Sequence, residues 1–181
     1  MRTQCPGCGV ALEAVEGPLD PYGASSPACW AAYGEVMARE FSDLGHFASH
    51  RMGVDAYMAQ HPSRSSRAAV QSVWVHLAAL CLAIERDAPP AYVAKLMAKM
   101  TLPQREFEWL ESPPHGRAIT VGRLAASEGA VAHFEAVRAW GESVWESWSE
   151  HHHRIRELVD ETQTASLPPD ASLRARRTTG R

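Results

Sequence analysis

Apolar side chains recur at intervals of three and four residues along most of this 181-residue chain. That spacing places them on one face of an α-helix, and helix-breaking prolines such as Pro62, Pro89 and Pro90 separate one stripe from the next. Ser26 and Pro27 suit the N-cap and first position of a helix. The pattern predicts helices over residues 26–41, 46–61, 66–86, 90–100 and 130–161, and a short helix over 120–126.

No stretch shows the sustained two-residue alternation typical of a half-buried strand. Helices with one apolar face bury that face by packing together. The sequence therefore predicts an all-α fold, a helical bundle of about five helices that forms a single domain over residues 1–161. Within it, residues 1–25 are rich in Cys, Pro and Gly and are expected to form an irregular Cys knuckle. Residues 162–181, rich in Arg and poor in apolar side chains, are predicted to be a disordered tail.

The first residues lack the apolar core of a signal peptide. The longest apolar run, residues 73–84, is interrupted by His76 and is shorter than the roughly 20 residues of a membrane span. A net charge of −3 argues against a general nucleic-acid binder, although the Arg-rich tail leaves a transcription accessory role open. A cytoplasmic protein is expected, and in that reducing compartment its four cysteines would be thiols or metal ligands.

The sharpest chemical signal is a Cys-x-x-Cys motif at the start of the chain. Cys5 and Cys8 are spaced to place both sulfurs on one tetrahedral ion, and the Gly9 that follows tolerates the left-handed backbone of such a turn. Cys29 follows after 20 residues, in the first turn of a predicted helix, where the helix N-terminus favours a thiolate. We predict a structural Zn²⁺ held by Cys5, Cys8, Cys29 and an unassigned fourth ligand. A redox pair and an incidental motif remain alternatives.

Histidines supply the candidates for that fourth ligand and for a second site. His50 and His61 share a face of the predicted 46–61 helix but lie about 16 Å apart along its axis, so they cannot bind the same ion. Either could complete the Cys cluster. His76 and His152, together with His50, His61 or Asp55, could also build a second polar or metal site inside the bundle. The alternative is that each is a partly buried His satisfied by one hydrogen bond.

Several motifs, taken together, are similar to those of one bacterial family. They are Cys5-Pro6-Gly7-Cys8-Gly9, Ser26-Pro27-Ala28-Cys29-Trp30, Val54-Asp55-Ala56-Tyr57 with Gln60-His61-Pro62, Gln71-Ser72-Val73 with His76-Leu77, Leu80-Cys81-Leu82, Trp109-Leu110-Glu111, and Trp148 with His151-His152. From Cys5 to about Val159 the chain resembles domain of unknown function 5946. The resemblance implies one small domain and adds weight to the Cys and His positions, but it implies no reaction. Gly122 departs from the expected acidic residue.

Two functions from different classes fit these observations. The first is a small zinc-binding protein that binds a small molecule or a protein partner, with no role at a membrane and with nucleic acid as a disfavoured partner. The second is a metal-dependent enzyme with a His-based site in the bundle, a thiol transferase or hydrolase analogous in fold to the DinB-like enzymes, in which the metal would activate a thiol or water. The sequence identifies no catalytic residue and leaves open whether the chain is an enzyme.

Overall fold

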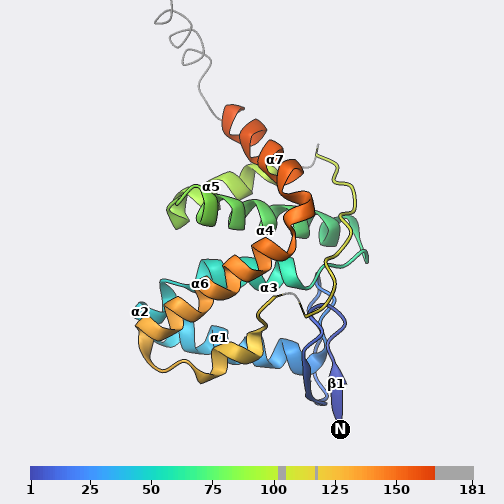
Figure 1. The fold of residues 1–181 in the computed structure, drawn as a ribbon, viewed down its shortest axis with the longest axis vertical. Helices are drawn as coiled ribbons and strands as arrows, with labels where there is room; N and C mark the ends of the chain where they lie inside the picture. Colours follow the sequence, from blue (N-terminus) through green and yellow to red (C-terminus); the bar gives the residue numbers. More distant parts are fainter. Residues whose placement is uncertain (102–104, 117, 166–181) are drawn as a thin grey trace, which may run out of the picture.

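The computed structural model describes residues 1–101, 105–116 and 118–165 and is mostly helical (Figure 1). The described part contains seven α-helices, two 3₁₀ turns and one two-stranded hairpin. In chain order these are β1 (Arg2–Gln4), β2 (Ala11–Glu13), α1 (Pro27–Ser42), α2 (Leu44–Phe47), α3 (His50–Gln60), α4 (Arg67–Glu85), α5 (Pro90–Met100), η1 (Val121–Ala126), α6 (Gly129–Ser147), η2 (Ser149–His151) and α7 (His152–Thr164).

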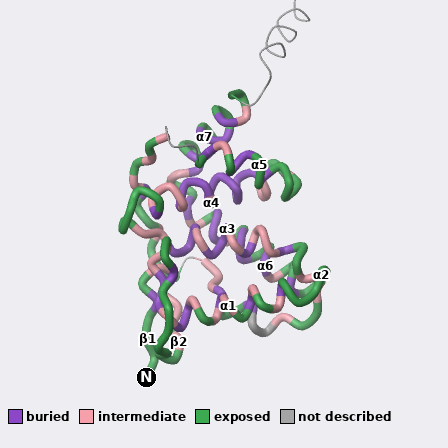
Figure 2. Tube along the Cα trace, turned by 180° about the vertical axis from the view of Figure 1, so that it is seen from behind, coloured by how far each residue is buried: buried purple, intermediate pink, exposed green. Residues whose placement is uncertain are grey.

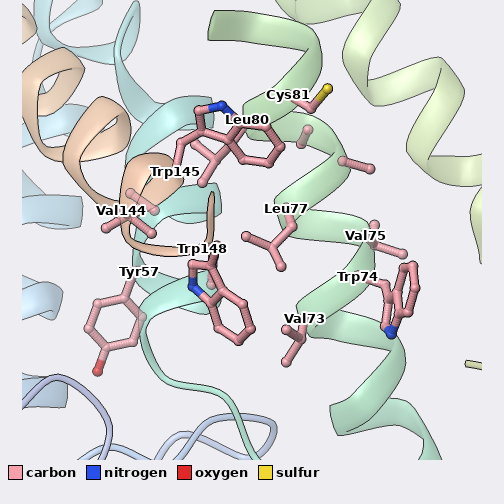
Figure 3. Packing of buried hydrophobic residues seen from close by; sticks show 14 of the residues in the cluster. Tyr57, Val73, Trp74, Val75, Leu77, Leu80, Cys81, Val144, Trp145 and Trp148 are labelled. Carbon is pink, nitrogen blue, oxygen red and sulfur yellow. The ribbon is translucent and has the colours of Figure 1, made fainter. Parts of the chain in front are cut away.

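The helices are arranged around α3 and α4. Helix α3 packs against both α4 and α6, and α4 also packs against α5 and α7, while α1 lies with η1 and α2 on the other side of the molecule (Figure 1). Buried residues are concentrated on α3, α4 and α6 (Figure 2). In the core, the indoles of Trp145 and Trp148 lie beside Leu80 and Leu77 of α4 (Figure 3). The predicted helical bundle is therefore confirmed in its general form.

Helix α4 is long and apolar enough to meet the criterion of length and composition for a membrane span. More than half of it is buried inside the molecule, however. This burial is what a central core helix shows, and it is consistent with a soluble protein.

The single helix predicted over residues 46–61 is wrong, because the chain breaks at Ala48 and Ser49 into α2 and α3. Asp43 caps α2 by accepting hydrogen bonds from the backbone amides of Gly45 and His46, at 2.8 and 3.2 Å. The Ser49 hydroxyl donates to the backbone carbonyl of His46, at 2.8 Å. The Ser49 hydroxyl and amide occupy the His46 carbonyl, which one continuous helix would pair with the amide of His50.

The long helix predicted over residues 130–161 is also broken, at Trp148. The chain turns there through η2, and α7 leaves α6 to pack on α4 and α5. His152 stabilises the break, because its Nε2 donates to the carbonyl of Trp145 at 2.9 Å and its ring stacks on the Trp145 indole. Helix α7 continues to Thr164, past the predicted end, and the rest of the predicted tail, from residue 166, lies outside the described residues.

The N-terminal segment was predicted to be irregular, but part of it forms a β-hairpin. Strands β1 and β2 pair antiparallel, with Arg2 opposite Glu13 and Gln4 opposite Ala11. Each strand has three residues, which is too short for an alternating pattern to stand out in the sequence. The hairpin exists because the Cys knuckle between its strands reverses the chain.

Candidate metal centre

The turn between β1 and β2 places Cys5 and Cys8 on the same side of the chain. The backbone amide of Cys5 donates to the carbonyl of Val10 at 2.8 Å, and the amide of Gly9 donates to the carbonyl of Cys5 at 2.9 Å. Gly9 has a φ of 77°, in the left-handed region that a residue with a side chain rarely adopts. The predicted need for glycine after the second Cys is therefore confirmed.

The third sulfur comes from the first turn of α1. Ser26 caps this helix, its hydroxyl accepting a hydrogen bond from the amide of Cys29 at 3.2 Å. The amide of Ser26 in turn lies 3.4 Å from the sulfur of Cys5, to which it donates. The N-terminus of α1 thus faces the knuckle, and its free amides favour negative charge on the sulfurs gathered there.

His61, at the end of α3, completes the group. Its Nδ1 donates to the carbonyl of Tyr57 at 2.7 Å, which leaves Nε2 as the atom with a free lone pair. That Nε2 lies 3.3 Å from the sulfur of Cys29. The structure therefore brings His61, and not His50, to the three cysteines.

The four candidate ligand atoms are spaced as one tetrahedral ion requires. All lie within 4.8 Å of one another, and the sulfurs of Cys8 and Cys29 are 3.8 Å apart. A tetrahedral ion with a metal–sulfur distance of about 2.3 Å separates two sulfur ligands by about 3.8 Å. Cys5 and Cys29 are fully buried, and Cys8 and His61 nearly so.

The cluster favours negative charge on the sulfur of Cys5 and a proton on that of Cys29. Hydrogen bonds from Cys29 and Cys8 hold the pKa of the Cys5 thiol well below its usual range, although burial acts in the opposite direction. The hydrogen bonds with Cys5 and Cys8 raise the pKa of Cys29, and burial adds to this. Burial lowers the pKa of His61, but hydrogen bonds with Cys5 and Cys8 outweigh it and raise this pKa to about 9. A divalent cation would take the place of the shared protons.

Neighbouring residues pack closely around the site. A Cβ added at Gly7 would lie 2.7 Å from the ring of His61 and 2.6 Å from the carbonyl of Ala24. His115 covers the knuckle from the other side, with its Nε2 3.0 Å from the carbonyl of Pro6. The cavity that borders Cys8 has a volume of about 30 Å³. A closed, four-ligand site of this kind is typical of structural rather than catalytic zinc.

The other predicted site residues lie in separate places. His50 Nδ1 donates to Glu40 Oε2 at 2.9 Å, and the buried His133 donates to Glu40 Oε1 at 3.0 Å. His152 is bonded to the backbone of Trp145, as described above. Within the described residues, Cys5, Cys8, Cys29 and His61 are the one group of three or more such side chains whose ligand atoms all lie within 4.8 Å of one another.

One part of the expected second polar site does form. His76 Nδ1 lies 2.7 Å from Asp55 Oδ1, joining α4 to α3. Arg51, which is not among the predicted site residues, binds the same carboxylate through Nε and Nη2, at 2.9 and 2.7 Å. Its position four residues before Asp55 on a helix was the signal that could have identified it.

Glu40 and His133 were missed as well. Glu40 is fully buried in α1, at helical spacing from the apolar Tyr33 and Val36. That spacing could have shown that its carboxylate faces inward and needs a partner. No sequence pattern pointed to His133, which lies 93 residues farther along the chain.

Comparison with known proteins identifies the family of the chain but no activity. No curated protein and no solved structure gives a match. A model described as "Family of unknown function (DUF5946)" matches residues 3–149, a segment that contains all four residues of the candidate metal centre. Because this match covers most of the chain, the protein belongs to that family.

Proposed function

We propose that the protein binds one structural Zn²⁺ through Cys5, Cys8, Cys29 and His61. The observation that carries this proposal is the group of four buried ligand atoms, all within 4.8 Å of one another. Three thiolates and one imidazole are a standard closed ligand set for zinc, and soft sulfur ligands disfavour Mg²⁺ and Ca²⁺.

The zinc would join three segments that are distant in the sequence. Cys5 and Cys8 belong to the hairpin, Cys29 to α1 and His61 to the end of α3. In the described part of the chain, one backbone hydrogen bond joins residues 1–25 to the end of α3, from the Ala24 amide to the His61 carbonyl at 3.0 Å. Coordination would therefore supply much of the free energy that holds this region in place.

In this proposal the helical body acts as a binding module for a small molecule or a protein partner, in the cytoplasm. The four cysteines are all free in the structure, which suits a reducing compartment. The closed metal centre leaves no open coordination position for a substrate, so the site is better suited to a structural role than to metal-dependent catalysis.

Metal analysis of protein purified without a His tag tests the proposal. We expect one zinc per chain, and we expect Cys5→Ser and His61→Ala to abolish it. Two matched controls, Cys81→Ala and His50→Ala, remove the same residue types outside the cluster and should retain the metal. Two results would overturn the proposal. One is protein without a bound ion after growth in medium with zinc, and the other is an ion that survives both Cys5→Ser and His61→Ala.

A further inference from the structure

A partly buried ion pair of Arg51 and Asp55 lies where α3 meets α4, against the imidazole of His76. Asp55 is 2% exposed, and its carboxylate accepts hydrogen bonds from Arg51 through both oxygens and from His76 Nδ1 through Oδ1. An ionised carboxylate with these partners can only accept. The proton of a neutral His76 ring therefore resides on Nδ1, and Nε2 carries the lone pair.

The lone pair of His76 Nε2 is available to accept a hydrogen bond or a proton from a ligand. His76 Nε2 makes no hydrogen bond to any residue in the described part of the chain, and the His76 side chain is 16% exposed. Arg51 and Asp55 fix the ring from behind, so the tautomer and the direction of Nε2 are both set before anything binds. Asp55 is a positioning residue here, in the way that a carboxylate orients the imidazole of a general base.

His76 lines an open cavity of about 450 Å³ between the two helices. Val54, Met58 and Val75 form apolar walls, and Ser72 and Gln71 add a hydroxyl and an amide next to His76 on α4. Apolar walls with a few convergent polar groups are typical of small-molecule sites. The cavity is distinct from the metal centre, since none of the four metal-centre residues lines it.

We propose that this cavity binds a small weak acid with an apolar body, such as a phenol or a thiol, and that His76 Nε2 accepts its proton. The O–H or S–H bond of the ligand breaks, an N–H bond forms at Nε2, and the anion stays paired with the imidazolium. The buried carboxylate of Asp55 stabilises that imidazolium. Arg51 neutralises Asp55 while the ring is uncharged, so the Asp55 carboxylate can stay buried in both states.

This inference specifies the ligand-binding part of the proposed function and does not depend on the metal. An anion held against the imidazolium accepts a charge-assisted hydrogen bond, which is stronger than the hydrogen bond that its neutral acid makes to the uncharged ring. The site therefore favours ligands that can lose a proton near neutral pH over alcohols of the same shape.

The experiment uses the full chain as purified, with 4-nitrophenol as the probe because its anion absorbs visible light. We expect the protein to bind the probe and to increase its ionised fraction at a pH where most of the free probe is protonated. Nitrogen-15 NMR of histidine-labelled protein without the probe should show the Nδ1–H tautomer for His76. Loss of probe binding and of probe ionisation in His76→Asn supports the proposal.

His76→Asn is the decisive variant, because its amide can replace Nδ1 as the donor to Asp55 while Nε2 is removed. We expect at least a tenfold loss of probe affinity, whereas His153→Asn, at an exposed position on α7, should change nothing. Unchanged binding in His76→Asn, binding without ionisation, or an Nε2–H tautomer would each overturn the proposal. Zinc is measured in the same samples, so a missing ion would count against the metal centre alone.

Discussion

The N-terminal region, residues 1–25, and the helical body are held together by different forces. In the body, large apolar side chains such as Leu77, Leu80 and Trp140 are fully buried. In the N-terminal region the buried side chains are Cys5, Cys8, Asp20 and Ser25, and none of them is aliphatic or aromatic. A segment with no apolar core cannot offset the entropy of ordering its backbone by burial alone. The proposed metal coordination would therefore do for the hairpin what packing does for the helices.

Removal of the proposed ion should have the largest effect, because it should destabilise the N-terminal region and leave the helical body folded. Structural zinc contributes apparent free energies of about 10–16 kcal/mol in small zinc domains. With excess chelator, we expect the amides of Cys5, Gly9 and Ala24, which are hydrogen-bonded in the structure, to lose protection from hydrogen exchange. Amides in the middle of α4 should remain protected. Equal loss of protection in both regions, or none in the hairpin, would show that the forces are not divided in this way.

Leu77→Ala should act on the body and spare the metal. Leu77 is fully buried in α4, and removal of such a side chain costs about 2–5 kcal/mol because it leaves a cavity. Urea unfolding followed by circular dichroism measures the loss, and metal analysis should show unchanged zinc. Val15→Ala serves as the control in the N-terminal region, since Val15 is 48% exposed and its truncation should cost less than about 0.5 kcal/mol. A Leu77 variant that lost its zinc would contradict the separation.

The smallest effect is expected at Glu85, which ties α4 to α6 and α7. Its carboxylate accepts from Arg156 at 2.6 and 2.8 Å and from the indole of Trp145 at 3.1 Å. The hydrogen bond from Arg156 lowers the pKa of Glu85, against the opposing effect of burial. A lowered folded pKa means that the stabilisation is present above the unfolded value of 4.5 and is lost as the pH falls through the folded value.

Glu85→Gln should therefore reduce the free energy of unfolding at neutral pH by up to about 1 kcal/mol and flatten its acid dependence. Glu142→Gln, which removes a more exposed pair with Arg138, is the matched control and should have a smaller effect. Chemical unfolding from pH 7 down to pH 3 makes the comparison. An acid dependence that is the same in both variants would exclude a contribution from Glu85.

Local rules predicted the helices that start and stop at strong signals. Helix α5 spans Pro90–Met100 as expected, and α1 begins at Pro27 behind the Ser26 cap. The same rules failed at Ser49 and Trp148, where side chains bond to the helix backbone and the chain turns to reach new packing partners. Those breaks depend on what lies across the core, which periodicity along one stretch of chain does not contain.

Some features of the candidate site could likewise be predicted from the sequence, and others depended on the tertiary structure. The spacing of Cys5 and Cys8, the position of Cys29 in the first turn of a helix and the glycine at position 9 could all be derived from the sequence, because each depends on backbone geometry over a few residues. Only the tertiary structure distinguished His61 from His50, joined His76 to Asp55 and separated both from His152. The physical reason is that these choices depend on which helix faces pack together, and that packing is a property of the whole chain.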